Sequence, residues 1–298
     1  MITGYSITTR PAALVVIFLF LALMVMSSFE SIVYDIRNFS LSYSDNSKSV
    51  IVEEEIEEEY ESCLRPRRNS DAIERAPLQP PFINLGMPKM GSTSLHHYFQ
   101  CAGHNSVHWK CGKKKNGERI YCGECMVSAI QAGRSPLAIS KCVGSTKKIQ
   151  SYAQIDRGPE NLLQVNYLNE ILGGVSNATF ILTFRNMTNW YRSLTNWHPP
   201  DRPEKNMRYR FERANITGLP KGVGRNVSEF SSFYCEYVKR VRKEVAKYPG
   251  HTLVEIDIED PMAGLQMEEA FGISDSCWGH QNTAKHNGTV TKEELQRR

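Results

Sequence analysis

The chain has 298 residues, of which 41% are hydrophobic, and its formal net charge at pH 7 is +4. This length accommodates one catalytic domain with appendages, and the hydrophobic content is ordinary for a globular protein. Such a small net charge gives no indication of a nucleic-acid partner, and none is expected.

An apolar segment near the amino terminus runs without a break over residues 11–26. About 17 apolar residues are the short end of what spans a membrane. Arg10 precedes the segment and acidic residues follow it, which favours a cytoplasmic amino terminus. We therefore expect residues 1–29 to form a cytoplasmic tail and one membrane-spanning signal-anchor helix. A cleaved signal peptide is the alternative, because Ser27 and Ser28 are small enough for a cleavage site.

Cysteines and glycosylation sequons both indicate the secretory pathway. The eight cysteines are an even number, compatible with disulfide bonds: Cys63, Cys101, Cys111, Cys122, Cys125, Cys142, Cys235 and Cys277. Asn-x-Ser/Thr sequons occur at Asn38, Asn177, Asn186, Asn215, Asn226 and Asn287. A zinc knuckle around Cys122 and Cys125 is the alternative, although the second CxxC pair of a zinc ribbon is missing. We expect disulfides.

Residues 30–80 have the composition of a stem. They contain few aromatic residues, an acidic run from Glu53 to Glu61 and several prolines, a composition that cannot bury a core. We therefore expect a disordered stem over residues 30–80 and a globular domain over residues 81–298.

Strands and helices are expected to alternate in this domain. Apolar runs predict strands over residues 82–85, 151–156, 179–185 and 252–258. Helical spacing and stop signals predict helices after the first strand and over residues 159–172, 189–197, 230–248 and 261–272. Residues 101–150 are expected to form a cross-linked excursion, and residues 199–225 a long loop. This alternation predicts an α/β domain with a mainly parallel central sheet, in which ligands bind at the carboxyl ends of strands.

The stretch from Phe82 to Leu95 predicts a strand, an anion-binding loop and a helix. Gly86 and Gly91 let the backbone approach a ligand closely, and the helix start offers N–H groups and a positive dipole end. The expected cofactor-binding residues here are Lys89, Met90, Gly91, Ser92, Thr93 and Ser94. A Walker A loop has its lysine directly after the second glycine, whereas this chain has Ser92 there.

Residues 88–95, Pro-Lys-Met-Gly-Ser-Thr-Ser-Leu, resemble the 5′-phosphosulfate loop of the sulfotransferases, which use 3′-phosphoadenosine-5′-phosphosulfate (PAPS). Arg185 at a strand end and Ser193 in the following helix resemble the 3′-phosphate motif of that family. The chain departs from this motif at Met187 and Trp190, where the family commonly has proline and arginine. The two motifs occur in the family's order, so the chain is similar to a membrane-anchored Golgi sulfotransferase of the carbohydrate branch.

This resemblance implies a P-loop-like, three-layer domain behind the anchor and stem. It implies sulfuryl transfer from PAPS to a hydroxyl or amine acceptor on a glycan, in a single-pass type II Golgi membrane protein with a lumenal catalytic domain. Lys89 would stabilise transition-state charge, and no metal is expected. The acceptor's identity and the oligomeric state stay open. A non-catalytic lumenal glycan-binding protein is the alternative, and a P-loop nucleotide kinase is a weaker one.

A hydroxyl acceptor also needs a general base. His108 lies in an expected short strand and could face the cleft, and an unperturbed histidine pKa of about 6.5 suits a base near neutral pH. Asp156, at the end of the strand over residues 151–156, is the second candidate, provided that burial raises its pKa. Since His108 could equally cap the cysteine-rich loop, the base stays open.

Overall fold

The structure is a computed structural model that describes residues 62–67, 78–114, 116–143, 148–156, 162–197, 206–222 and 224–279. The chain divides into two units, residues 1–59 and 60–298, and every described residue belongs to the second. The expected tail and signal anchor (residues 1–29) lie outside the described residues, as does most of the expected stem (residues 30–80). None of the helices that the structure describes is long and apolar enough to cross a bilayer.

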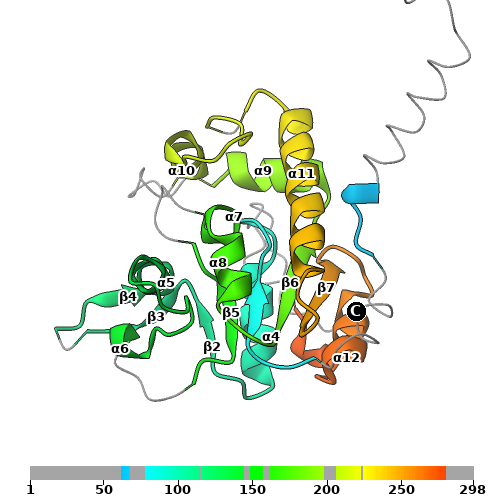
Figure 1. Ribbon diagram of the computed structural model, residues 1–298. Coiled ribbons are helices and arrows are strands. Elements are labelled where there is room, and N and C mark those ends of the chain that lie inside the picture. Colours follow the sequence, from blue (N-terminus) through cyan, green and yellow to red (C-terminus); the bar gives the residue numbers. More distant parts are fainter. Residues whose placement is uncertain are drawn as a thin grey trace, which may run out of the picture. The chain divides into compact units, whose positions relative to one another are not determined.

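The described strands form one seven-stranded sheet in the order β4-β3-β2-β5-β1-β6-β7. These strands are β1 (Phe82–Asn84), β2 (Ser106–His108), β3 (Lys110–Lys113), β4 (Arg119–Tyr121), β5 (Ser151–Gln154), β6 (Ala178–Phe184) and β7 (His251–Asp257). Strands β2, β5, β1, β6 and β7 are parallel, while β3 and β4 add an antiparallel extension at one edge (Figure 1). The prediction of an α/β fold with a mainly parallel sheet is confirmed.

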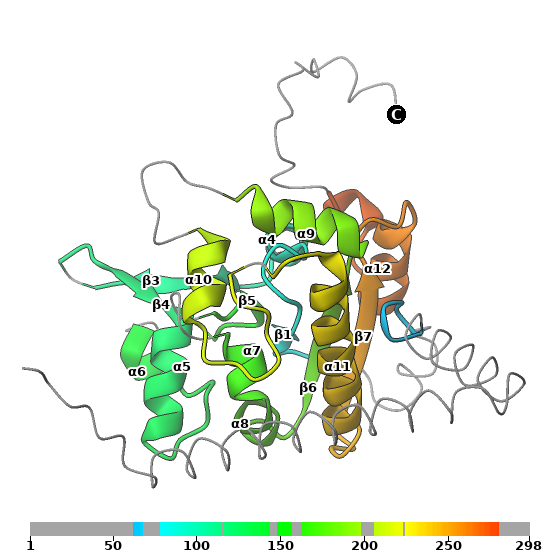
Figure 2. The same cartoon turned by 90° about the horizontal axis from the view of Figure 1, so that it is seen from above.

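Helices cover both faces of this sheet. They are α4 (Ser92–Cys101), α5 (Cys122–Gln131), α6 (Ser140–Val143), α7 (Leu163–Asn166), α8 (Leu168–Gly173), α9 (Met187–Thr195), α10 (Met207–Arg213), α11 (Val227–Val245), α12 (Ala263–Phe271) and the 3-10 helix η2 (Asp275–Cys277). Figure 2 shows α4 and α12 on one side of the strands and α7, α8 and α11 on the other. Along β6, Phe180 and Leu182 join the core beneath α11, whereas Ile181 joins the core beneath α4. Burial on both faces explains the continuous apolar run of this strand.

Strand β1 lies at a topological switch point. It sits between β5 and β6 in the strand order. From β1 the chain passes through α4 to β2, which lies in the direction of the β4 edge. From β6 the chain passes through α9, α10 and α11 to β7, which lies at the opposite edge. Open α/β sheets bind their ligands where the connections of neighbouring strands diverge in this way. The topology therefore directs attention to the carboxyl ends of β1 and β6.

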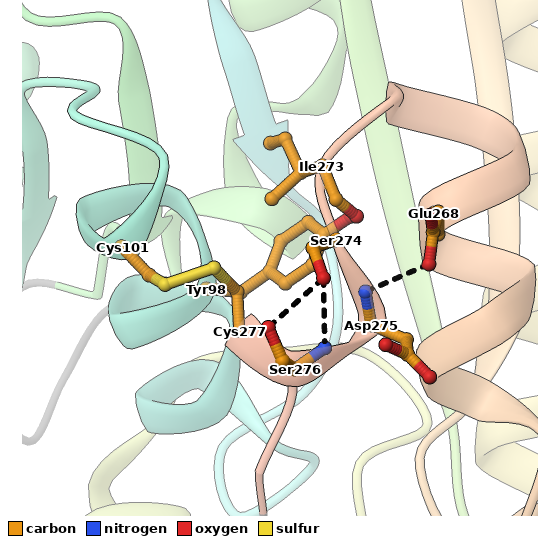
Figure 3. The surroundings of a disulfide bond; sticks show 8 residues. All are labelled: Tyr98, Cys101, Glu268, Ile273, Ser274, Asp275, Ser276 and Cys277. Carbon is orange, nitrogen blue, oxygen red and sulfur yellow. Dashed lines mark hydrogen bonds between the residues drawn. A yellow bond between two sulfur atoms is a disulfide. The ribbon is translucent and has the colours of Figure 1, made fainter.

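All eight cysteines are paired, which confirms the disulfide prediction. The bonds are Cys63–Cys235, Cys101–Cys277, Cys111–Cys122 and Cys125–Cys142. Because these bonds take up the sulfurs of Cys122 and Cys125, the zinc-knuckle alternative is wrong. Figure 3 shows how Cys101–Cys277 joins the last residue of α4 to η2, beside Tyr98. The Tyr98 hydroxyl donates to the Ile273 carbonyl at 2.9 Å, so the carboxyl end of α4 is anchored twice.

Part of the expected stem packs on the domain. Cys63 is buried and bonded to α11, and the Arg67 backbone N–H donates to Glu255 Oε2 at 2.7 Å. Arg242, which forms a buried ion pair with Glu255, also donates to the Arg65 carbonyl at 2.8 Å. The folded unit therefore includes residues upstream of the expected boundary at residue 81.

The expectation of one continuous helix over residues 159–172 is wrong within the described residues 162–172. The structure has two short helices there, α7 and α8, which meet at Tyr167. The carbonyl of Gln164 accepts from the Tyr237 hydroxyl at 3.3 Å, and that of Val165 accepts from Arg240 at 3.1 Å. Side chains of α11 thus satisfy carbonyls that the next helical turn would otherwise occupy.

The expected loop over residues 199–225 contains a helix, α10, which the sequence analysis missed. Met207, Arg210 and Phe211 of α10 are buried, and the Phe211 ring lies 5.7 Å from that of Phe230. Because the tract is rich in positive charge, the sequence analysis overlooked two apolar residues one helical turn apart, Met207 and Phe211. Tertiary packing of that pair stabilises a helix too short to form alone.

Candidate active site

The loop between β1 and α4 is held by neighbouring elements. The Gly86 N–H donates to Asn84 Oδ1 at 2.8 Å, and Gln164 Nε2 donates to the Gly86 carbonyl at 3.2 Å. The Tyr237 hydroxyl donates to the Leu85 carbonyl at 2.7 Å. Side chains from α7 and α11 therefore fix the backbone before it reaches Lys89.

Both glycines of the loop are required by their surroundings. A Cβ atom at Gly86 would overlap the Thr183 side chain, so β6 and the loop approach too closely for any other residue. Gly91 has a φ of +80°, where only glycine is unstrained, and a Cβ there would lie 2.9 Å from Ile258. Gly91 is also the N-cap of α4, and no side chain caps this helix start.

Lys89 has an unusual conformation and environment. Its φ is +69°, which is rare outside glycine and recurs at functional sites. Its ammonium lies 3.4 Å from the ring centroid of the partly exposed Trp197. Burial, and then the charge of Arg185, lower the pKa of Lys89 to about 8. Among the residues that the structure describes, no carboxylate pairs with this ammonium.

Arg185, the first residue after β6, brings the two expected cofactor motifs together. Its Nη1 donates to the Lys89 carbonyl at 3.1 Å, and its Nε donates to Glu259 Oε1 at 2.7 Å. The other oxygen of Glu259 accepts from Asn189 Nδ2 at 3.0 Å. Glu259, which follows β7, thus orients both Arg185 and the start of α9. The sequence signal for it was available, since it comes directly after a predicted strand.

Trp190, one of the positions where the chain departs from the motif that it resembles, has a local role in the fold. Its side chain is fully buried, and its Nε1 donates to the Pro88 carbonyl at 2.8 Å. The helix that carries it starts at Met187 and is capped by Asn186, two residues earlier than expected. The buried tryptophan therefore holds the backbone of the loop that carries Lys89.

The remaining expected cofactor residues differ in how far their side chains are buried. Met90 is fully buried and Ser94 is buried, whereas Ser92 and Thr93 are half-buried at the start of α4. Ser193 is half-buried in α9, and no hydrogen bond joins it to Arg185 in the part of the chain that is described. The structure therefore joins Arg185 to the loop by a hydrogen bond, whereas Ser193 has no such bond to Arg185 among the described residues.

His108 lies next to the loop. Its Nε2 is 3.1 Å from Ser92 Oγ, which is itself 3.4 Å from Gln154 Oε1 in the neighbouring strand β5. Burial, followed by the nearby His96, lowers the pKa of His108 to about 4, although the charge of Asp156 acts in the opposite direction. The unperturbed pKa of 6.5 assumed from the sequence does not apply. His108 is neutral across the physiological range.

Asp156 is part of a buried ion pair. Its side chain is 2% exposed, and its Oδ2 accepts from Arg210 Nη2 at 3.0 Å and from Gln154 Nε2 at 2.7 Å. Two donors therefore occupy this one carboxylate oxygen. This geometry suits a structural anchor better than a proton acceptor. The sequence analysis missed Arg210 because it lies in the tract expected to be a loop.

Comparison of the sequence with models of known protein families and with curated proteins finds no match.

Proposed function

We propose that this protein transfers a sulfuryl group from PAPS to a hydroxyl or amine on a glycan. The observation that carries the proposal is the hydrogen bond from Arg185 Nη1 to the Lys89 carbonyl at 3.1 Å. It joins a strand-end arginine to a lysine-bearing loop at the switch point of a parallel sheet. Helices on both faces of the sheet support the finer description of a P-loop-like, three-layer domain.

The residues around the loop suit an anionic donor. Lys89 and Arg185 are close enough for one charge to lower the pKa of the other, and no carboxylate in the described residues pairs with the lysine. The start of α4 adds the positive end of a helix dipole. A site with surplus positive charge binds an anion favourably. Lys89, Arg185 and the backbone of residues 90–94 would hold the phosphates and sulfate of PAPS, which supplies the sulfuryl group.

Lys89 would stabilise the charge that develops in the transition state. Sulfuryl transfer resembles phosphoryl transfer in that the protein contributes positioning and electrostatic stabilisation. An anion beside Lys89 raises its pKa, so the ammonium is charged when the donor is bound. Trp197, stacked on this ammonium, shields one side of it from water.

Arg185 would bind the 3′-phosphate with Ser193. Glu259 holds the guanidinium through Nε, and the Lys89 carbonyl occupies Nη1. In the described part of the chain no hydrogen bond is made by Nη2, so this group is available to a phosphate oxygen. Glu259 then orients Arg185 toward its ligand.

His108 would accept the acceptor's proton. It is neutral near pH 7 and touches the loop through Ser92, whereas Asp156 is engaged with Arg210. A neutral imidazole has a lone pair ready for a proton, and the nearby Asp156 carboxylate stabilises the imidazolium that results.

The proposed location is the Golgi membrane, with a type II anchor and a lumenal catalytic domain. Four disulfides support an oxidising compartment. Three sequon asparagines within the described residues are exposed, as glycan attachment requires: Asn177, Asn215 and Asn226. Asn186 is exposed as well, but we expect it to stay bare, because a glycan there would block the cofactor loop.

Radiolabelled PAPS, offered with a panel of glycans, tests the proposal directly. We expect label on a glycan, loss of transfer in Lys89→Ala and normal transfer in Lys247→Ala. Lys247 is a matched control because it is an exposed lysine paired with Glu244 at the end of α11. Glycan binding without transfer, unaffected by Lys89→Ala, would instead indicate a glycan-binding protein. Magnesium-dependent ATP turnover would indicate a kinase.

A further inference from the structure

A continuous line of polar side chains connects α10 with His108. Arg210 Nη2 donates to Asp156 Oδ2 at 3.0 Å, and Gln154 Nε2 donates to the same oxygen at 2.7 Å. Gln154 Oε1 lies 3.4 Å from Ser92 Oγ, and Ser92 Oγ lies 3.1 Å from His108 Nε2. The line crosses from β5 to the start of α4 and back to β2, so it passes through the proposed cofactor loop.

The direction of the first bonds is fixed by chemistry. The Asp156 carboxylate, which forms an ion pair with Arg210, can only accept, so the NH₂ group of Gln154 must face it. The carbonyl oxygen of Gln154 must then face Ser92. The reverse orientation of this amide would place two acceptors 2.7 Å apart.

The Ser92 hydroxyl has one proton to share between two neighbours. If it donated to His108, its oxygen and Gln154 Oε1 would face each other as two acceptors without a proton between them. If it donates to Gln154, its lone pairs can accept from a protonated Nε2 of His108. Only the second arrangement gives both contacts a proton.

We propose that Gln154 is a positioning residue that sets the tautomer of His108, with the proton on Nε2 and the basic lone pair on Nδ1. Asp156 and Arg210 act through it, because they fix the orientation of the Gln154 amide. Asp156 therefore supports the base instead of being an alternative to it. The effect on catalysis, but not the tautomer itself, rests on the proposed sulfuryl transfer.

The charged and titratable groups around His108 leave this assignment unchanged at neutral pH. His96, His97 and Lys110 disfavour the imidazolium, and Asp156 favours it. The His96 ring is 5.5 Å from that of His108, and its Nδ1 is engaged with Ser106 Oγ at 3.0 Å. One neutral tautomer is thus selected by the Ser92 contact.

Nitrogen NMR of the full chain, labelled with ¹⁵N in histidine, measures the tautomer without any assay of transfer. The resonances that disappear in His108→Gln identify this ring. At pH 7 we expect a protonated Nε2 and an unprotonated Nδ1. A proton on Nδ1, or an equal mixture of both tautomers, overturns the proposal.

Gln154→Met, which keeps the length of the side chain but removes the amide, tests the role of Gln154. We expect the His108 resonances to move toward a mixture of tautomers and kcat to fall about tenfold, with little change in KM for PAPS. Gln150→Met is the matched control, because Gln150 precedes β5 and accepts from Asn105 away from His108. Unchanged His108 resonances in Gln154→Met would contradict the proposal. A predicted tautomer in a protein that transfers no sulfuryl group would refute the proposed function alone.

Discussion

The two halves of the candidate site differ in how their buried charges are compensated. On the side of the expected cofactor loop, the ammonium of Lys89 contacts the ring face of Trp197 and experiences the positive charge of Arg185. No carboxylate among the described residues pairs with it. On the base side, the Asp156 carboxylate has Arg210 and Gln154 as donors. A buried charge that lacks a counter-charge destabilises the folded protein until a ligand supplies one. The comparison distinguishes Lys89, whose environment favours an added anion, from Asp156, which is already held by two donors.

Asp156→Ala should have the largest effect, and it should act on stability. Removal of one partner from a buried ion pair takes the Asp156 carboxylate away from the buried Arg210 guanidinium, which costs about 3–5 kcal/mol. Denaturant unfolding of the purified protein measures this loss. The double variant Asp156→Ala, Arg210→Met should recover part of it, because the buried guanidinium is then gone as well. A stable Asp156→Ala protein would contradict the framework role.

Lys89→Ala should leave stability intact and remove transfer. Its ammonium is desolvated and pairs with no carboxylate among the described residues, so its loss should not weaken folding. Loss of one charged transition-state contact lowers kcat by about 10²-fold or more. Unfolding curves and PAPS turnover, measured on the same preparation, separate the two effects. Turnover within about tenfold of the original protein would remove Lys89 from the mechanism.

The sequence predicted the meeting of Lys89 and Arg185 better than it predicted the surroundings of His108 and Asp156, for a physical reason. Lys89 and Arg185 follow strands whose apolar runs are unmistakable, and the carboxyl ends of parallel strands meet at one edge. The disulfide chemistry was likewise readable from cysteine number, although the pairing was not. Arg210 lies far along the chain in a short helix that only tertiary packing stabilises, so its pairing with Asp156 left no local signal. The break between α7 and α8 was hidden in the same way, because side chains of α11 cause it.

Arg185→Ala should weaken nucleotide binding selectively. If Arg185 binds the 3′-phosphate, its removal costs 3′,5′-bisphosphoadenosine about 1.5–3 kcal/mol and costs 5′-AMP little. Calorimetric titration with both nucleotides gives the comparison. Glu259→Gln is the matched variant, since it keeps a hydrogen-bond acceptor for Nε but removes the counter-charge. We expect it to bind the bisphosphate at least as well as the original protein, and equal losses for both nucleotides in Arg185→Ala would refute the assignment.

The pH dependence of kcat/KM should be the smallest of these effects. It should separate the ionisation of Lys89 from that of His108. In the free protein, Lys89 must be protonated and His108 neutral, so kcat/KM should fall as pH rises through about 8 and as it falls through about 4. Because bound anions raise the lysine pKa, the alkaline limb of kcat should lie at higher pH than that of kcat/KM.

The ionisation of Lys89 should make the free energy of unfolding depend on pH, in a direction that its pKa predicts. Its pKa is about 8 in the folded protein and 10.5 in the unfolded chain, so between these values the unfolded state binds more protons. The free energy of unfolding should therefore rise with pH across that window. Lys89→Met should lose this rise, whereas Lys247→Met, an exposed paired lysine, should keep it. Identical pH profiles of unfolding for the original protein and Lys89→Met would show that Lys89 is not desolvated, and the contrast between the two halves of the site would fail.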